Sequence, residues 1–381
     1  MTANLGENAI ARLRMASLLL ASTGAPASGS PTPDSPRDPS DVARWFGAMQ
    51  SQDLSSGMWS FGVRLPHLDL TDIKASIADG SVLRTWTQRG TIHFVAAEDT
   101  RWMLRICGRR TLNRAAARRA QLGLETDEVT RGVDVLAENL VGGRRLTRAE
   151  GSDVLDHAGI QTDGQRLYHL LWFAAQSGIT CIGPNQGKEQ TFVLLDEWAP
   201  TQTELDDDQA LAELALRYFR SHGPTTRQDF AGWAGITAAM AKRGIAGATD
   251  SLTEVTGMGK QMWLAEELLD RQDEIGPRRT RRVWTPPGFD EYLLGFKDRS
   301  VPVPSGMMDR IIPGRNGVFQ ATVVYDGRVI ATWKRRMTKT RVQIDLFPFQ
   351  ELSKERLRRT RTAFGRYANF LGVEADLRTH E

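Results

Sequence analysis

The feature that most restricts the fold of this chain is a recurring order of short amphipathic helices followed by a two-stranded hairpin. The clearest copy lies within residues 203–277. It predicts helices and then paired strands over Asp208–Ser221, Thr225–Ala234, Thr237–Ala246, Leu252–Thr256 and Gln261–Leu264. Helix, turn, helix and a two-stranded wing in this order are typical of a winged-helix domain.

A second copy, within residues 143–202, follows the same plan. Thr147 and Glu150 have the spacing of a capping box at the start of a helix, which is predicted to end near His157. The remaining elements are predicted over Gly164–Gln176, Ile179–Ile182 and Gln190–Leu194.

The copy within residues 1–142 is interrupted and ends in a helical connector. Residues 22–39 are rich in Pro and Ser and cannot bury enough apolar surface to order themselves, so a mobile surface insertion is expected there. A helix over Asp41–Gln50 is expected to have Ser40 or Asp41 as its cap. The other predicted elements are helices over Ile10–Leu20 and from Asp69 to about Ala78, and strands over Val82–Trp86 and Thr91–Ala96.

The last part of the chain, residues 278–381, is rich in strand patterns. Strands are predicted over Val283–Pro287, Val318–Tyr325, Arg328–Lys334 and Thr340–Leu346, and a helix over Ser353–Leu371. Asp326-Gly327, between two alternating segments, is typical of a hairpin turn. The predicted fold class is therefore α+β, with three tandem winged-helix units and a C-terminal β-barrel-like domain or curled sheet with a terminal helix.

Composition excludes several classes of protein. The 381 residues are 25% charged and 40% hydrophobic, and no apolar run is long enough to cross a bilayer, so no membrane partner is expected. Cys107 and Cys181 lie far apart and the six histidines are scattered, so no disulfide, metal site or cofactor is expected. The N-terminus lacks the pattern of a secretion signal, and the predicted location is the cytoplasm.

Arginine supplies almost all of the positive charge, with 41 residues against eight lysines, and it is clustered at 109–119, 278–282, 334–336 and 356–361. The planar fork of arginine binds phosphate in two places. The clusters are either solvated helix faces in a GC-rich coding background or contacts with a polyanion such as DNA. On the second interpretation Arg118, Arg119 and Arg335 are candidate DNA contacts, and the protein is associated with the nucleoid.

Three further segments carry specific signals: residues 46–52, residues 84–93 with Arg84-Thr85-Trp86 and Arg89-Gly90-Thr91 before His93, and residues 289–299. In this order they resemble the AlkZ/YcaQ-like family of bacterial DNA glycosylases, and the resemblance extends from about Ile10 to Leu371. It implies tandem winged helices and a C-terminal β-barrel that form a concave DNA-binding face. It also implies excision of N-alkylated purines, including purines in interstrand crosslinks.

The catalytic signature of that family is glutamine, an aliphatic residue, and then glutamine or aspartate. Gln50 and Gln52 match the glutamines of the AlkZ branch, whereas Ser51 departs from the aliphatic position. Glutamine is a poor acid and a poor base, so such a site suits a leaving group that is already activated. An alkylated purine departs neutral, and the site then has only to place a water and stabilise the cationic sugar. From spacing alone, both residues would be ordinary helix-end glutamines.

Several neighbours are possible accessory residues. Asp53 adjoins the pair and could activate water or cap a helix, and His93 could contact substrate or have a structural role. Arg89 belongs to the turn of the same matching segment. Candidate DNA contacts on the predicted wing, which either enters a groove or is an exposed turn, are Met258, Lys260 and Gln261.

Two classes of function remain open. The first is a monofunctional DNA glycosylase, acting as a monomer on double-stranded DNA that contains N7-alkylguanine or N3-alkyladenine. No lysine lies near the glutamines in the sequence, which disfavours a Schiff-base step. The second is a non-catalytic winged-helix DNA-binding protein, either a transcription regulator or a lesion sensor. Release of a free base distinguishes the two classes.

Overall fold

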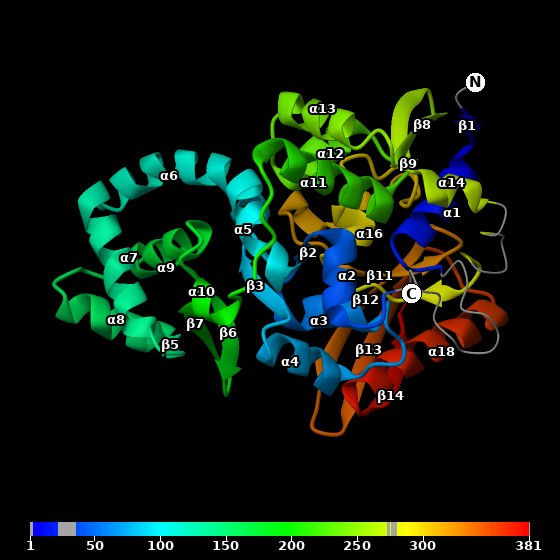
Figure 1. Cartoon of the computed structure of the whole chain (residues 1–381). Helices are drawn as coiled ribbons and strands as arrows, with labels where there is room; N and C mark the ends of the chain where they lie inside the picture. The colour runs from blue at the N-terminus through cyan, green and yellow to red at the C-terminus, as the bar shows by residue number, and fades with distance from the viewer. Residues whose placement is uncertain (1–2, 22–35, 273–274, 276–279, 381) are drawn as a thin grey trace.

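The computed structural model describes residues 3–21, 36–272, 275 and 280–380 of the chain (Figure 1). Most of the predicted insertion at 22–39 lies outside these residues. The described part is a mixed α+β fold with three sheets, and none of its helices is long and apolar enough to span a membrane.

The first group of elements contains the glutamine pair. Its elements are β1 (Ala3–Leu5), α1 (Glu7–Ser17), α2 (Pro39–Phe46), β2 (Met49–Gln50), α3 (Leu54–Gly62), α4 (Leu70–Ala78), β3 (Val82–Trp86) and β4 (Ile92–Ala96). The predicted strands around the Arg89-Gly90 turn and the helix capped by Asp69 are confirmed.

The helix predicted over Asp41–Gln50 is wrong at both ends. Asp38, rather than Ser40 or Asp41, caps α2, because its side chain accepts a hydrogen bond from the backbone N–H of Asp41. Gly47 ends the helix with a φ of 80°, a conformation that favours glycine. The chain then becomes extended and β2 pairs with β4.

A helical connector leads to the second group. The connector consists of α5 (Thr100–Met103), the π-helical segment η3 (Leu104–Gly108), α6 (Arg109–Gln121) and α7 (Thr126–Leu140). The second group consists of β5 (Leu146–Thr147), α8 (Arg148–His157), α9 (Arg166–Gln176), β6 (Thr180–Gln186), β7 (Glu189–Leu194) and α10 (Leu195–Trp198). The predicted capping box of Thr147 and Glu150 is confirmed.

A single sheet joins the first two groups. Its order is β2-β4-β3-β6-β7-β5, and the pairing of Arg84 with Ile182 connects the two hairpins. In Figure 1, α6 and α7 arch around the second group on the left of the molecule. This arrangement leaves the end of β3 facing α8 and α9.

The third group is a further set of helices followed by a hairpin. It consists of α11 (Asp207–His222), α12 (Arg227–Ala234), α13 (Ala238–Gly247), β8 (Leu252–Gly257), β9 (Lys260–Ala265) and α14 (Glu266–Asp270). The hairpin gains a third strand from the start of the chain, because β1 pairs with β8 in parallel. Helix α1 packs against the same hairpin through Ile10 and Leu13.

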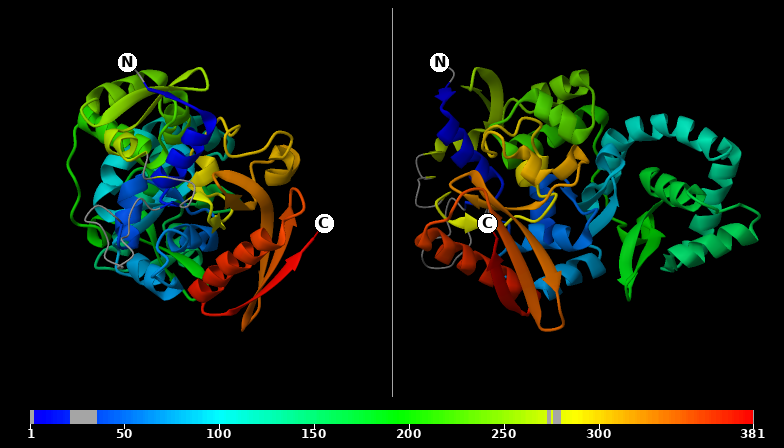
Figure 2. Two further views of the ribbon diagram at one scale, coloured as in Figure 1. Left: turned by 90° about the vertical axis from the view of Figure 1, so that its right-hand side faces the viewer. Right: turned by 180° about the vertical axis from the view of Figure 1, so that it is seen from behind.

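The C-terminal part is an open sheet of order β10-β11-β12-β13-β14. Its elements are β10 (Val283–Trp284), α16 (Glu291–Leu294), α17 (Met308–Ile311), β11 (Ala321–Tyr325), β12 (Arg328–Met337), β13 (Arg341–Pro348), α18 (Lys354–Leu371) and β14 (Glu374–Thr379). Figure 2 shows how strongly the sheet is curved and how far the β12–β13 hairpin projects.

The predicted barrel-like domain or curled sheet is confirmed as a curled sheet, in which β10 and β14 do not pair among the described residues. The prediction of a terminal helix needs correction, since α18 is followed by β14, which pairs in parallel with β13. Strand β14 lacks an alternating apolar pattern, because Leu377 is its only large apolar residue.

The largest core cluster connects the first group with this C-terminal sheet. Trp59 contacts Tyr367 and Phe370 of α18, and its indole N–H donates to the carbonyl of Thr285. Trp59 and Trp86 are both buried.

Candidate active site

The glutamine segment begins as the strand β2, Gln52 lies in the bend that follows it, and exposure alternates along the segment. Gln50 ends β2 opposite His93, and the N–H of Ser51 donates to the carbonyl of Ile92 at 2.9 Å. Met49 and Ser51 are buried, whereas Gln50 is half-buried and Gln52 is exposed. Side chains two residues apart on an extended chain share a face, which a helix would not allow. The preceding helix ends at Gly47, three residues before Gln50.

Arg84 holds the backbone between the two glutamines. Its Nη2 donates to the carbonyl oxygen of Ser51 at 3.0 Å, and the side chain is 5% exposed. Burial lowers the pKa of Arg84 to about 10, so the guanidinium still carries its charge at neutral pH. No carboxylate of the described residues forms an ion pair with it, which leaves a buried positive charge beside the glutamine segment.

A buried carboxylate reaches the same segment from the C-terminal part. Glu291 Oε1 accepts a long hydrogen bond, 3.4 Å, from the backbone N–H of Gln50. Glu291 Oε2 lies 3.2 Å from His222 Nε2 and accepts from the indole N–H of Trp233 at 2.9 Å. Burial works against its charge, but the contacts with His222 and Trp233 hold the pKa of Glu291 below its ordinary value. Glu291 therefore connects the glutamine segment with α11 and α12.

Asp53 caps the helix that follows the pair. Its Oδ1 accepts from the backbone N–H of Ser56 at 2.7 Å and from the hydroxyl of Ser55. Although burial raises it, these hydrogen bonds and the charge of Arg335 hold the pKa of Asp53 below its ordinary value. Arg335 also contacts Ser55 and donates to the Tyr367 hydroxyl at 3.0 Å. Of the proposed DNA contacts, Arg335 is the one that touches the segment following the glutamines.

The other two accessory candidates differ in exposure: His93 is buried and Arg89 is exposed. The side chain of His93 is 1% exposed, and its Nδ1 is 2.8 Å from the Thr91 carbonyl and 3.0 Å from Thr87 Oγ1. Burial, with the nearby charge of Arg89, lowers the pKa of His93 to about 4, so its ring is neutral at neutral pH. Arg89 donates to the carbonyls of Gly232 and Trp233 at the end of α12. His93 therefore supports the site from within the protein, whereas Arg89 is exposed and joins the turn after β3 to α12.

The remaining candidate DNA contacts are distributed over other elements. Met258 is exposed at the turn of the β8–β9 hairpin with Gln261 close by, and Lys260 Nζ pairs with Asp298 at 2.5 Å. Arg118 and Arg119 lie on α6, where Arg118 donates to Gln121 and Arg119 lies over the ring of Phe173. The structure does not bring these residues to the glutamines.

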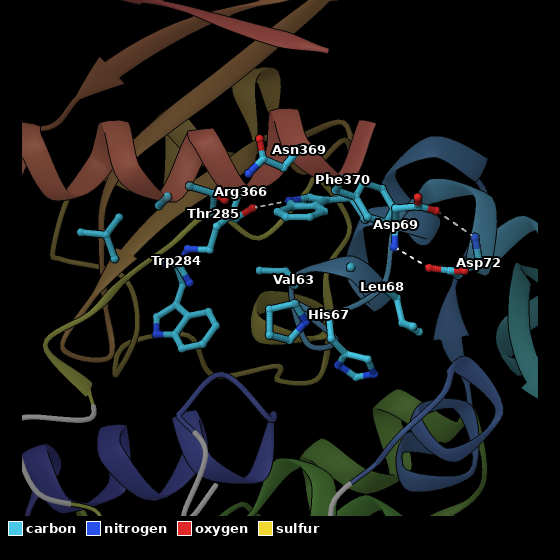
Figure 3. Close-up of a pocket in the computed structure, with 15 residues that line it drawn as sticks. Val63, His67, Leu68, Asp69, Asp72, Trp284, Thr285, Arg366, Asn369 and Phe370 are labelled. Atoms are coloured by element: carbon cyan, nitrogen blue, oxygen red, sulfur yellow. Dashed lines mark hydrogen bonds between the residues drawn. The ribbon is translucent and has the colours of Figure 1, made fainter. Parts of the chain in front are cut away.

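Two cavities lie near the first group. The larger, about 790 Å³, opens beside Gln52 and extends from Arg84 and Trp86 to α8 and α9. The smaller, about 260 Å³, lies between the α3–α4 connection, β10 and α18 (Figure 3). Neither glutamine lines the smaller cavity, and its acidic residues Asp69 and Asp72 are engaged in the capping box of α4.

Within the described part of the chain, no group of three or more His, Cys, Asp or Glu side chains is placed to hold a metal ion.

Sequence reasoning assigned no role to Arg84 or Glu291, although both lie in the segments that carry the family resemblance. A charged residue inside an otherwise apolar strand, as at Arg84, was an available signal. Glu291 precedes an apolar run, and a carboxylate at such a position is typical of the first turn of a helix.

The chain also matches known proteins over most of its length. Residues 43–370 match the family described as DNA glycosylase AlkZ-like. An interstrand DNA cross-link repair glycosylase of Streptomyces sahachiroi is 26% identical over 317 residues, which are 77% of this chain and 81% of that protein. The solved structure of the Streptomyces sahachiroi DNA glycosylase AlkZ superposes with a TM-score of 0.80 at 21% identity, covering 99% of this chain and 100% of the other. The chain therefore belongs to the AlkZ-like family of DNA glycosylases.

Proposed function

We propose that this protein is a monofunctional glycosylase that hydrolyses the N-glycosidic bond of cationic N-alkylated purines, N7-alkylguanine and N3-alkyladenine, in double-stranded DNA. The observation that carries the proposal is the alternating exposure of the glutamine segment, in which Gln50 and Gln52 reach the surface on either side of the buried Ser51. Arg84 and Glu291 fix its backbone from within the protein.

The chemistry of an amide pair fits this substrate class. A cationic alkylated purine leaves as a neutral base, so no general acid is needed at the leaving group. A glutamine Oε1 accepts a hydrogen bond from water and places it below C1′, while the partial negative charge of the same oxygen stabilises the cationic sugar. Of the residues that line the cavity at Gln52, none is a lysine, which favours direct hydrolysis over a Schiff-base step.

Interstrand crosslinks are a second part of the proposed substrate range. The relative from Streptomyces sahachiroi is described as a cross-link repair glycosylase. A purine tied to the opposite strand cannot rotate freely into a closed pocket, whereas exposed Gln52 can be reached by DNA lying across the surface. Repair or self-resistance against a genotoxic compound is the corresponding biological role.

The proposed DNA-binding unit is one copy of the chain. We interpret residues 1–142, 143–202 and 203–277 as three winged-helix units, and residues 278–381 as the curled sheet that completes the binding face. Arg118, Arg119 and Arg335 would contact phosphates, and the β8–β9 turn with Met258, Lys260 and Gln261 would act as a wing.

The test is release of free base from duplex DNA that contains N7-methylguanine. We expect release well above the spontaneous rate, and a loss of about 100-fold in kcat in the variant Gln50→Ala/Gln52→Ala, because both electrostatic contacts disappear. DNA affinity is expected to stay unchanged. The matched control is Gln161→Ala/Gln165→Ala, which removes two exposed glutamines of the second group.

Unchanged excision in the Gln50/Gln52 variant would refute the role of the pair. Tight binding of alkylated duplex without any release by the native protein would instead identify a lesion sensor. A sequence-specific operator would identify a regulator.

A further inference from the structure

Strand β2 is an edge strand, so only one side of its backbone is paired with another strand. It stands first in the sheet order β2-β4-β3-β6-β7-β5, and the N–H of Ser51 donates to Ile92 on the side of β4. Successive N–H groups of a strand point to opposite sides, so the N–H of Gln50 points away from β4. On that open side it donates to the carboxylate of Glu291 at 3.4 Å. Glu291 therefore occupies the place that a neighbouring strand would take beside Gln50.

The third group holds the carboxylate of Glu291 from its other side. Its Oε2 accepts from the indole N–H of Trp233 on α12 at 2.9 Å and lies 3.2 Å from Nε2 of His222 on α11. The His222 ring is itself enclosed, because it stacks on Tyr218 at 4.6 Å and Gly295 packs against it with no room for a side chain. Glu291 is only 2% exposed, which separates its side chain from DNA on the surface. The position of this carboxylate is therefore set by α11 and α12.

Position 291 needs a carboxylate because two donors approach its two oxygens separately. The N–H of Gln50 meets Oε1, and the N–H of Trp233 meets Oε2. A side-chain amide of the same shape has only one acceptor oxygen, and its NH2 group donates. The bond to Trp233 is the shorter of the two, so the amide oxygen of a glutamine at 291 would stay there. The N–H of Gln50 would then face an NH2 group and lose its acceptor.

We propose that Glu291 is a positioning residue for hydrolysis, by which α11 and α12 determine the placement of the Gln50 amide. The inference rests on the proposed glycosylase function, in which Gln50 places a water and stabilises the sugar. It adds that the third group contributes to the geometry of the reaction as well as to DNA binding. A displacement of about 1 Å in a group that orients a reactant can cost about 100-fold in rate, so a contact of this kind has a measurable effect.

The test measures base release by Glu291→Gln from duplex DNA that contains N7-methylguanine. We expect kcat to fall about tenfold with KM unchanged, because the side chain orients Gln50 without touching DNA. The matched control is Asp229→Asn. Asp229 is also a buried carboxylate between the third group and the C-terminal part, and it accepts from the backbone N–H of Lys297 at 2.8 Å. None of its hydrogen bonds among the described residues reaches the glutamine segment, so this variant should keep the native kcat.

Double-mutant cycles show whether Glu291 acts through Gln50. In the Gln50→Ala background, Glu291→Gln should cause no further loss of kcat, because the amide that it positions is absent. In the Gln52→Ala background the same substitution should still cost about tenfold. Equal further losses in both backgrounds would overturn the inference, since they would show a general effect on the fold. A native kcat in the single variant Glu291→Gln would overturn it as well.

Hydrogen exchange of single backbone amides separates failure of the proposed function from failure of this inference. The amide of Gln50 should exchange roughly tenfold faster in Glu291→Gln than in the native protein, because it loses its acceptor. The amide of Ser51, which donates to Ile92, should keep its native rate. If the native protein releases no base, the glycosylase proposal fails and the exchange rates alone decide the inference. An unchanged rate at Gln50, or an equal acceleration at Ser51, would overturn it.

Discussion

Ser51 occupies the position at which this chain departs from the aliphatic residue of the family signature, and the structure places it in the core. Its side chain is 0% exposed, and its Oγ has no hydrogen-bond partner among the described residues. Gly57 of α3 packs directly against Ser51. A Cβ added at Gly57 would lie only 3.1 Å from the Cβ of Ser51. A small residue at 51 therefore matches the close approach of α3 to β2.

His93 should make the free energy of unfolding depend on pH. Its pKa in the folded protein is about 4, whereas an unfolded histidine has a pKa of roughly 6.5. Between these pH values the unfolded chain binds more protons than the folded protein. The contribution of the neutral His93 ring to the free energy of unfolding is therefore complete above about pH 6.5. It is lost as the pH falls towards 4, by at most about 1.4 kcal/mol per pH unit. The groups that act on the ring are Arg89, Glu291 and the carbonyl of Thr91.

Urea unfolding at pH 7, 6 and 5 measures this dependence. The variant His93→Asn lacks the titrating ring and should show a shallower slope than the native protein. His169, whose pKa is also lowered to about 4, contributes equally in both proteins. Parallel slopes would show that His93 does not titrate as its burial predicts.

At the level of elements, the decisive feature is the change from α2 to β2 within four residues. Gly47 stops the helix and Met49 and Gln50 pair with β4, so that Gln50 and Gln52 reach the surface while Ser51 is buried. The α16 segment then docks under them through Glu291. The neighbouring residue, Asp290, forms a buried two-point ion pair with Arg64, with nitrogen–oxygen distances of 2.7 and 2.9 Å.

The ion pair between Arg64 and Asp290 should be important for stability. Asp290→Asn would leave a buried guanidinium without its counter-charge, and we expect the free energy of unfolding to fall by about 3–5 kcal/mol. The control Asp309→Asn breaks an exposed pair with Arg315 and should cause no measurable change. Urea denaturation of both variants is the measurement, and equal effects would contradict the expectation.

For the whole molecule, the first and second groups share one sheet, and the C-terminal sheet shares a core with the first group. Units that look separate in the sequence are therefore packed around the glutamine segment. Arginines from distant parts of the chain, such as α6 and β12, can contact one DNA molecule only through this packing.

Salt dependence tests the proposed phosphate contacts. Each contact contributes a slope of about 0.9 in a plot of log binding constant against log salt concentration, so Arg118→Ala/Arg119→Ala should reduce the slope by about two. The base-release rate at saturating DNA should stay unchanged. The control Arg378→Ala, on β14 and paired with Asp376, should leave the slope as in the native protein. An unchanged slope in the double variant would exclude α6 from the DNA interface.

The sequence by itself determined the order and type of most elements. Capping residues such as Asp69 and Thr147 act locally, and so do turn residues such as Asp326-Gly327, so their effect can be predicted from neighbours alone. The family resemblance, rather than local spacing, pointed to Gln50 and Gln52, which are two residues apart. The helix predicted over Gln50 was wrong because strand pairing across the sheet overrode local spacing.

Only the tertiary structure decided what surrounds that pair. Arg84 is 33 residues from Ser51 and Glu291 is 241 residues from Gln50, and no local pattern links positions so far apart. The cavity beside Gln52 likewise depends on the pairing of β3 with β6, which brings α8 and α9 against Trp86. Contacts of this kind follow from packing over the whole chain, because burial and hydrogen bonding are satisfied between elements rather than along one segment.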